Sequence, residues 1–400
     1  MNSKERILKC LEHEEPDKVP YYEHLIQQPQ LEAKIFNRSY TGFPLTNEKV
    51  QKILQRVGKN EFIVNAINKI TEFVLKKPDI LSPILRSIIK GYLRFYKALK
   101  VDFTIFPAGP FSYYKWLPPN KILTEFGVKS EIKIMQTGIL MLYYNSGLFK
   151  DKETYYELRE KWNSPNPLGL LFWKNMKKIH KDEDMVVAPA MHTGLFDSMV
   201  QGFGIENFSR LIHKDRPFIE QAIHDREIWY RTLIKELIDE FDIDFFFIGD
   251  DLAYDSGPFI SPKLFNSIFL PSYRRIAKLL HKHDIKFFFH SDGDILPIAD
   301  GLVDIADAIH PWQHSANIDI TNVKKKYGDR TTIIGNVPIP LLVHGTHAEI
   351  RRYVKNLLKR CAPGGGYILA SGNSIVSEIP WQNYLTMLST FHKHSSYDET

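Results

Sequence analysis

Short runs of apolar residues alternate with helical stretches over most of this chain, and this rhythm constrains the fold more than any other feature. The runs lie at residues 102–107, 185–190, 245–250, 286–290, 305–311, 331–336 and 367–371, and a further strand is expected near Val19. Helical patterns separate the later runs, at residues 215–241, 262–283, 319–327, 347–361 and 380–393. Apolar strands that alternate with helices are typical of a parallel sheet covered on both faces. Eight of them predict an α/β fold, a (β/α)8 TIM barrel.

Two segments interrupt this rhythm. Residues from about 45 to 100 contain helical patterns such as "EFIVNAINKITEFVLKK" with no strand between them, which predicts an inserted helical cap near the N-terminus. Residues from about 113 to 150 alternate apolar and polar side chains, as in "KILTEFGVKSEIKIMQ", which predicts an inserted β-hairpin. We therefore expect residues 1–400 to form a single barrel domain that carries both insertions.

Composition and charge exclude several classes of protein. The net charge is +5 over 52 basic and 47 acidic residues, which is too weak to indicate nucleic-acid binding. The two cysteines, Cys10 and Cys361, cannot build a disulfide framework, as is typical of a reducing compartment. The start "MNSKERILKC" does not resemble a signal peptide, and no apolar run approaches the ~20 residues that span a bilayer. We therefore expect a cytoplasmic protein that binds neither nucleic acid nor membrane.

Polar and ionisable side chains stand where the expected strands end. In (β/α)8 barrels these ends meet at one face, and that face carries the chemistry. The residues at these positions are Glu23, His24, His192, Asp250, Asp251, His290, Asp292, His310, Asn336 and Asn373. Asn and Asp are common turn formers, but turn chemistry does not account for four histidines. The sequence therefore predicts a polar site at the carboxyl end of the barrel.

His290 and Asp292 follow the fifth expected strand in "KFFFHSDGDI". An imidazole and a carboxylate two residues apart could both bend toward the barrel axis and bind zinc or another divalent ion. A third ligand would come from another strand end, where Glu23, His192 and Asp250 are in reach. In the alternative interpretation, His290 hydrogen-bonds Asp292 and caps the helix expected near residues 294–301. The residues alone leave both interpretations open.

Asp250 and Asp251 could act as an acid–base pair or hold a ligand that is cationic or carries N–H groups. Two adjacent carboxylates raise each other's pKa when both point inward. Neighbours on a strand point to opposite faces, so we expect only one of the two, Asp250, to face the barrel axis.

Four stretches of the chain resemble the uroporphyrinogen decarboxylase superfamily, which includes porphyrinogen decarboxylases and corrinoid or coenzyme M methyltransferases. They are "SKERILKCLEHEEPDKVPYY", "GDDLAYDSGPFISPKLFNSIFLPSYRRI", "FFFHSDGDILPIADGLVDIADAIHPWQHSANIDITNVKKKYGDR" and "APGGGYILASGNSI". The resemblance covers nearly the whole chain and is strongest from residue 245 to 395. It implies a (β/α)8 barrel with its cleft at the carboxyl face.

Two departures from the family pattern bear on the reaction. Porphyrinogen decarboxylases carry an arginine-rich loop after the first strand, whereas "YYEHLIQQPQ" at residues 21–30 contains no arginine to hold substrate carboxylates. The coenzyme M methyltransferases hold zinc through a His-x-Cys pair and a later Cys. This chain has His290 and Asp292 at the pair, and Gly372 and Asn373 near the later position. The two thiolate ligands of that pattern are therefore absent from this chain, and Asp292 supplies a carboxylate in the pair.

We therefore expect an enzyme of this superfamily that moves a methyl group to or from a corrinoid, a tetrapyrrole bound to a partner protein. The expected catalytic residues are His290, Asp292, Asp250 and Glu23, and the expected metal ligands are His290 and Asp292. The expected substrate-binding residues are His192, His24, Asp251, His310, Asn336 and Asn373. The methyl donor would be a small molecule, and the family leaves room for a homodimer.

Two alternatives remain open. In a divergent decarboxylase acting on a porphyrinogen, Asp250 or Asp292 would accept hydrogen bonds from pyrrole N–H groups and stabilise charge that develops on the ring. In the other alternative, the barrel binds a tetrapyrrole and performs no chemistry.

Overall fold

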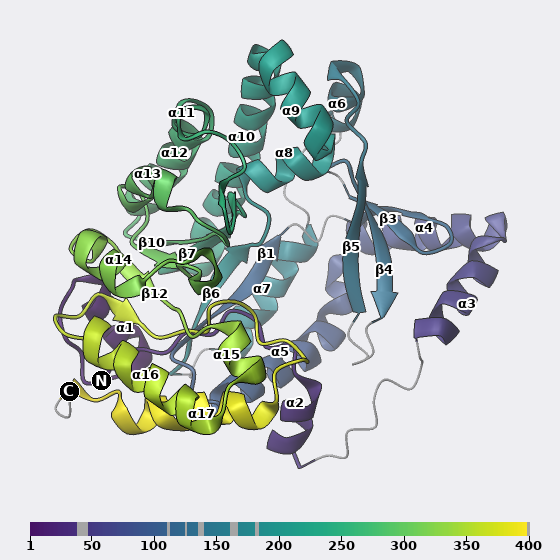
Figure 1. Ribbon diagram of the computed structural model, residues 1–400. Helices are drawn as coiled ribbons and strands as arrows, with labels where there is room; N and C mark the ends of the chain where they lie inside the picture. The colour runs from purple at the N-terminus through teal and green to yellow at the C-terminus, as the bar shows by residue number, and fades with distance from the viewer. Residues whose placement is uncertain are drawn as a thin grey trace.

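The computed structural model describes residues 1–37, 47–109, 113–124, 126–134, 140–160, 167–180 and 184–397, and shows an α/β fold (Figure 1). A curled central sheet contains seven strands, and every adjacent pair is parallel. In sheet order the strands are β1 (Phe103–Gly109), β6 (Val186–Met191), β7 (Phe245–Gly249), β10 (Lys286–His290), β11 (Ala308–His310), β12 (Thr332–Ile334) and β13 (Tyr367–Ile368). Each lies within or overlaps one of the apolar runs, so the parallel α/β fold predicted from the sequence is confirmed.

The expected first strand contributes isolated bridges instead of a full strand. Tyr21 pairs with Leu369, just beyond β13, and Tyr22 pairs with Phe103 in β1. The N–H of Tyr22 donates to the carbonyl of Leu369 (3.0 Å), and the N–H of Phe103 donates to the carbonyl of Tyr21 (3.1 Å). This segment therefore contacts both edge strands of the sheet, and the closed eight-stranded barrel stays a prediction.

Helices surround the sheet (Figure 1). After β6 the longer helices are α8 (Leu195–Phe203), α9 (Ile205–Lys214), α10 (Arg216–Phe241), α12 (Leu270–His281), α14 (Ile320–Tyr327), α16 (His347–Cys361) and α17 (Trp381–His394). The shorter segments there are β8 (Ala253–Tyr254), β9 (Gly257–Pro258), α11 (Pro262–Leu264), the π-helical η2 (Phe265–Phe269), η3 (Leu296–Ile298), α13 (Ala299–Val303), η4 (His314–Ala316) and α15 (Ile339–His344). No helix in the described ranges is long and apolar enough to cross a membrane.

Side-chain caps fix where several helices begin. The side chain of Ser261 accepts the N–H of Leu264, and Pro262 occupies the first position of α11. At α16 the side chain of Thr346 accepts the N–H of Glu349, whose own side chain accepts the N–H of Thr346. These caps fix the first residues of α11 and α16.

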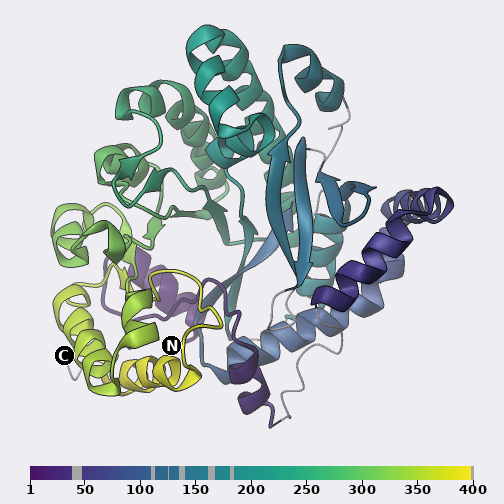
Figure 2. The same ribbon diagram turned by 45° about the vertical axis from the view of Figure 1, so that its right-hand side comes forward.

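The N-terminal part of the chain holds the other helices and the two insertions. The helices are α1 (Ser3–Leu11), α2 (Pro29–Ile35), α3 (Asn47–Gly58), α4 (Glu61–Lys76), η1 (Pro78–Leu81), α5 (Ser82–Ala98), α6 (Lys152–Arg159) and α7 (Pro167–Ile179). Helices α3 and α4 project to one side of the molecule, where α3 contacts β4 and α4 contacts β2 (Figure 2). The predicted helical segment is thus present from Asn47 onward, its role as a cap stays a prediction, and residues 45–46 lie outside the described residues.

The second insertion is larger than the predicted hairpin. It is a four-stranded antiparallel sheet of β2 (Tyr113–Leu117), β3 (Lys121–Thr124), β4 (Val128–Ile134) and β5 (Leu140–Gly147). The stretch that predicted the hairpin supplies the central pair, β3 and β4, and one strand adds to each side. Position 125 and residues 135–139 lie outside the described residues. A single hairpin was therefore wrong, because alternation identifies a strand but does not count its neighbours.

Aromatic side chains fill the inside of the sheet. Phe103, Phe245, Phe247 and Phe288 are fully buried there, and the rings of Phe103 and Phe288 lie 4.8 Å apart. Alternate residues of the same strands, such as Phe289, face the surrounding helices, as the two-residue period of a strand requires. The interior is therefore packed, and polar side chains at the carboxyl ends rest on an aromatic floor.

Candidate functional site

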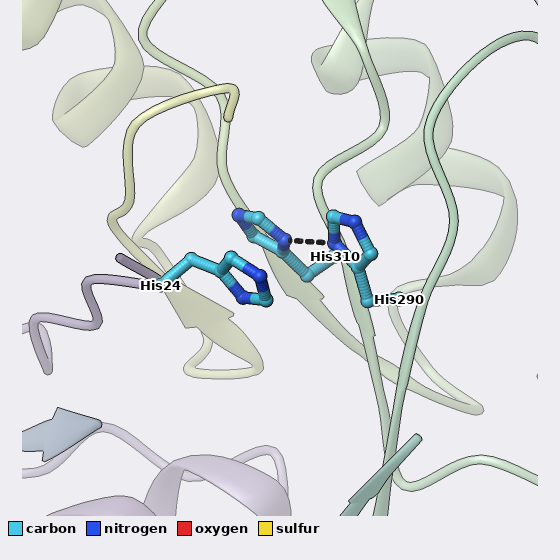
Figure 3. Close-up of side chains that lie close together, drawn as sticks. All are labelled: His24, His290 and His310. Carbon is cyan, nitrogen blue, oxygen red and sulfur yellow. Dashed lines mark hydrogen bonds between the residues drawn. The ribbon is translucent and has the colours of Figure 1, made fainter. Parts of the chain in front are cut away.

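Three buried imidazoles meet at the carboxyl end of the sheet (Figure 3). His290 ends β10, His310 ends β11, and His24 follows the segment that bridges the edge strands. The rings of His24 and His290 are stacked 4.7 Å apart, and those of His290 and His310 are stacked 4.9 Å apart. Burial lowers the pKa of His24 and of His310 well below the usual range, so both rings are neutral at pH 7.

A backbone carbonyl fixes which nitrogens of these rings carry hydrogen. Nε2 of His310 lies 3.2 Å from the carbonyl oxygen of Ser371, which can only accept, so Nε2 carries the proton. Nδ1 of His310 is then an acceptor, and Nδ1–H of His290 donates to it over 2.7 Å (Figure 3). In a neutral His290 this leaves Nε2 with a free lone pair. His310 therefore orients His290 and sets its tautomer.

Two carboxylates face this nitrogen of His290. Oδ1 of Asp292 lies 3.6 Å from Nε2, and Oδ1 of Asp251 lies 3.8 Å from it. The other oxygen of Asp292 accepts the side-chain N–H of Asn373 at 2.7 Å, whereas its Oδ1 is buried and has no hydrogen-bond partner among the described residues. Burial raises the pKa of Asp292 above its usual range. An unsatisfied buried acceptor beside a free imidazole lone pair is unfavourable unless something binds between them.

The donor set fits a divalent metal ion. One ligand atom each from Asp251, His290 and Asp292 lies within 4.8 Å of the others, and the same holds for His24, His290 and His310. In the group of three histidines, the Nδ1 atoms of His290 and His310 are occupied by the hydrogen bond between them. The group of Asp251, His290 and Asp292 therefore offers more free lone pairs to a metal ion. One nitrogen and two carboxylate oxygens suit zinc or another first-row ion. The N–H of His290 that His310 accepts is the orienting hydrogen bond such ligands usually have.

Asp250 lies against helix α8 instead of beside His290. Its two oxygens accept the backbone N–H groups of Phe196 (2.9 Å) and Asp197 (2.7 Å), and the hydroxyl of Tyr273 donates to it. A side chain at Gly194 would collide with Asp250, so glycine lets the start of α8 approach this carboxylate. Asp250 therefore anchors α8, and of the two adjacent aspartates the structure places Asp251 next to His290.

Asp197 joins the same acidic rim from the first turn of α8. Its carboxyl accepts the backbone N–H of Asp251 at 3.2 Å. Burial and the nearby Asp250 raise the pKa of Asp197 to about 9. Burial raises the pKa of Asp250 less, to about 7, because Asp250 accepts several hydrogen bonds that favour its charged form, so of the two carboxyls Asp197 is the one that holds the proton at pH 7.

Two other predicted residues, His192 and Glu23, lie close to this centre. His192 contacts the ring of His24 edge-on at 5.6 Å, and burial lowers the pKa of His192 to about 4. The carboxyl of Glu23 accepts the hydroxyl of Tyr21 (2.6 Å) and that of Ser371, and burial raises its pKa to about 7.

Asn336 is fully buried, and its side-chain N–H donates to the carbonyl of Trp312 at 2.5 Å. The structure thus gathers the predicted residues His24, His192, Asp251, His290, Asp292, His310 and Asn373 around one point. Asp250, Glu23 and Asn336 have partners of their own at its margin.

The sequence did not single out Asp197, Tyr273 or Ser371. Asp197 follows the third expected strand within "HTGLFDS", and this place after a strand end could have indicated a site residue. It was missed because Asp197 lies in the first turn of a helix and not in the loop before it. Tyr273 lies on α12, far from any strand end, and no local pattern could connect it to Asp250. Ser371 stands at the last strand end, and its role depends on contacts with Glu23 and His310.

One family model and one solved structure agree with this fold. A family model described as Uroporphyrinogen decarboxylase (URO-D) matches residues 186–394. A methyltransferase from Methanosarcina mazei has a similar structure, with a TM-score of 0.62 and 16% identity over 98% of this chain and 99% of that one. Dispersin B gives a TM-score of 0.36 and 12% identity over 77% of this chain and 94% of that one. No curated protein sequence matches significantly.

Proposed function

Because the chain belongs to the uroporphyrinogen decarboxylase family, we propose that it is a methyltransferase that moves a methyl group from a small-molecule donor to a corrinoid bound to a partner protein. The name of its structural neighbour, a methyltransferase, supports the same branch of the family. Membership in the family also supports a closed (β/α)8 barrel, in which residues 20–23 would join the two edge strands.

The partners of the carboxylates at the site carry this proposal. Asp292 is bound by Asn373 and lies beside His290, and Asp250 is held by backbone N–H groups and a tyrosine hydroxyl. Among the described residues, the arginines that pair with buried carboxylates lie elsewhere: Arg6 with Asp102, Arg159 with Asp225, and both Arg231 and Arg275 with Glu227. No arginine in the described part of the chain pairs with Asp250, Asp251 or Asp292, so a polycarboxylate porphyrinogen would meet like charge at this rim, which disfavours the decarboxylase reaction.

His290, Asp292 and Asp251 would hold a divalent metal ion, which would supply a Lewis acid beside the heteroatom of the methyl donor. Asn373 keeps Asp292 in place, and His310 keeps Nε2 of His290 free. In the transfer, the bond between the methyl carbon and its heteroatom breaks, and the electron pair stays on the heteroatom. The reduced corrinoid substrate supplies the pair for the new bond to carbon. The heteroatom takes up a proton, and Asp197 is a group at the rim that holds one at neutral pH.

The first test is the metal content of the purified protein. We expect near-stoichiometric divalent metal in the wild type, and metal affinity lower by about 10–100-fold or more in His290→Ala and in Asp292→Asn. Asp255→Asn is the matched control, because Asp255 lies on the same rim and accepts hydrogen bonds from Gln313 and Ser315. Equal metal content in all four proteins would contradict this ligand set.

The second test is the reaction itself. Wild-type protein is incubated with chemically reduced free cobalamin and a panel of methylated ethers, amines and thioethers, and methylation of cobalamin is followed by its absorbance. We expect transfer from at least one donor, and loss of transfer in the variant that loses metal. Conversion of uroporphyrinogen to coproporphyrinogen, with no transfer from any donor, would support the decarboxylase alternative instead.

A further inference from the structure

Large apolar side chains are exposed along the helical insertion, on α4, η1 and α5. Helix α4 projects to one side of the molecule there, together with α3 (Figure 2). Six side chains on α4, η1 and α5 are more than half exposed, and Phe62 reaches 81%. We call them the apolar ridge: Phe62, Ile70, Phe73, Ile80, Ile84 and Ile88. An exposed apolar patch of this kind is typical of a surface that binds a protein or a membrane.

The apolar ridge is separate from the apolar face that the fold buries. In α5, Ile84 and Ile88 are exposed, whereas Leu85, Ile89 and Leu93 are buried. Positions four residues apart lie on the same side of a helix, so these two sets form two different faces of α5. The core of the protein therefore uses one apolar face of this helix and leaves the other open to solvent.

The same insertion is strongly basic. Residues 47–100 contain twelve Lys and Arg against four Asp and Glu, although the net charge of the whole chain is only +5. One of the four acids, Asp79, already pairs with Lys174 of α7 at 3.3 Å. Nζ of Lys77 lies 5.6 Å from the ring centre of Phe73, which places a positive charge directly beside the ridge.

Exposed lysines accompany the ridge along its length. They are Lys59, Lys69, Lys76, Lys77 and Lys90. The charge of the whole chain, from which we expected no contact with a membrane, conceals this concentration of positive charge in one insertion.

We infer that the apolar ridge and its lysines bind the surface of an anionic lipid membrane. The apolar side chains enter the boundary between head groups and acyl chains, and the lysines contact the negative groups of the lipids. Each basic residue that comes near an anionic membrane strengthens the attraction, so the basic insertion and the exposed apolar side chains act together. This inference goes beyond the proposed methyl transfer and does not depend on it.

The charge of the insertion disfavours two other occupants. In a symmetric dimer the same patch meets its own copy, so the basic residues of one insertion would face those of the other and repel them. Interfaces between proteins are enriched in arginine and depleted of lysine, whereas nine of the twelve basic residues here are lysines. A lysine whose stem lies on apolar surface while its charge stays in water is instead typical of helices that lie on membranes.

The experiment is co-sedimentation with lipid vesicles. Wild-type protein is mixed with vesicles of phosphatidylcholine alone and with vesicles of equal parts phosphatidylcholine and phosphatidylserine. We expect the affinity for the anionic vesicles to be at least about tenfold higher than for the neutral ones. This difference should disappear at about 1 M salt, where charges are screened within about 3 Å.

Two double variants test the ridge itself. In Ile84→Asp with Ile88→Asp, we expect the Kd for anionic vesicles to rise by about tenfold or more, because two apolar side chains no longer leave water. The matched control is Ile205→Asp with Ile228→Asp, which changes exposed isoleucines of α9 and α10 and should leave the Kd unchanged.

Thermal unfolding establishes that each variant folds, and Phe62→Asp with Phe73→Asp on α4 replaces the ridge variant if it does not. An unchanged Kd in a folded ridge variant, or equal binding to neutral and anionic vesicles, would overturn the inference. Failure of the wild type to bind anionic vesicles would overturn it too and leave a protein as the occupant. Analytical ultracentrifugation without lipid identifies that protein as a second copy if the wild type is a dimer and the ridge variant a monomer.

Discussion

The carboxyl group of Glu23 is fully buried between Tyr21 and Ser371, and burial raises its pKa from 4.5 to about 7. The folded state therefore keeps a proton that the unfolded state releases at lower pH. The contribution of Glu23 to stability is present below pH 4.5 and is lost as the pH rises toward about 7. A difference of this size corresponds to about 3 kcal/mol.

Glu23→Gln should remove this dependence. An amide can accept the hydroxyl of Tyr21 and donate to Ser371, whose own hydroxyl can donate to the carbonyl of Asn373 at 2.5 Å. We expect the variant to be more stable than the wild type by about 2–3 kcal/mol near pH 8, and nearly equal to it near pH 5. Urea unfolding at both pH values measures the difference. The other carboxyl groups whose pKa is raised are present in both proteins, so their effects cancel in the comparison. A difference in the free energy of unfolding that does not change with pH would therefore contradict the prediction.

Individual residues also show which features of the site could be predicted from the sequence. The spacing of His290 and Asp292 after a strand predicted that they are neighbours, and their side chains lie 3.6 Å apart. The choice between Asp250 and Asp251 was not predictable, because the approach of α8 decides it, and α8 belongs to another βα unit.

At the scale of elements, helix α8 depends on a carboxylate from a neighbouring strand. Its own cap, Gly194, has no side chain to accept the first N–H groups, and Asp250 accepts them in its place. Asp250→Ala would leave two backbone N–H groups and the hydroxyl of Tyr273 without this acceptor. We expect a loss of about 2–4 kcal/mol in the free energy of unfolding, and faster hydrogen exchange in the first turn of α8.

Asp300→Ala is the control for that change. Asp300 is exposed in α13 and pairs loosely with Arg330, at 3.6 Å, so its removal should cost less than about 0.5 kcal/mol. Equal stability of Asp250→Ala and Asp300→Ala would show that α8 does not need this anchor.

The sequence predicted the strands and helices themselves well, because each carries its own apolar period. It underestimated the sheet of β2 to β5, because the pairing of strands depends on contacts outside any one strand.

At the scale of the whole molecule, the N-terminal segment connects the two edges of the sheet. The carbonyl of Pro20 accepts the N–H of Leu369 at 3.1 Å, and the carbonyl of Tyr21 accepts the N–H of Asp102 at 3.0 Å. Asp102 also accepts the N–H of Tyr21 with its side chain at 2.9 Å, and Arg6 of α1 donates to it at 2.6 Å. This buried ion pair fixes α1 and the connecting segment at the amino end of the sheet, opposite the candidate site.

Arg6→Met should therefore lower the free energy of unfolding by about 3 kcal/mol, since it leaves a buried carboxylate without its main partner. Arg330→Met, which removes exposed ion pairs with Asp300 and Asp304, should cost less than about 1 kcal/mol. Urea unfolding measures both. Metal content should stay unchanged in Arg6→Met, because the ion pair lies at the other end of the strands. Loss of metal in that variant with full stability would refute this separation of roles.

The sequence by itself determined the strands, the order in which they alternate with helices, and the polar residues at the strand ends. Periodicity and turn chemistry are local properties, so a single chain displays them. Only the tertiary structure decided which of these polar groups meet. The curvature of the sheet brings His24 and His310 to His290, and α8 takes Asp250 away from that group. The raised pKa values of Glu23 and Asp197 arise from burial among residues far apart in the chain.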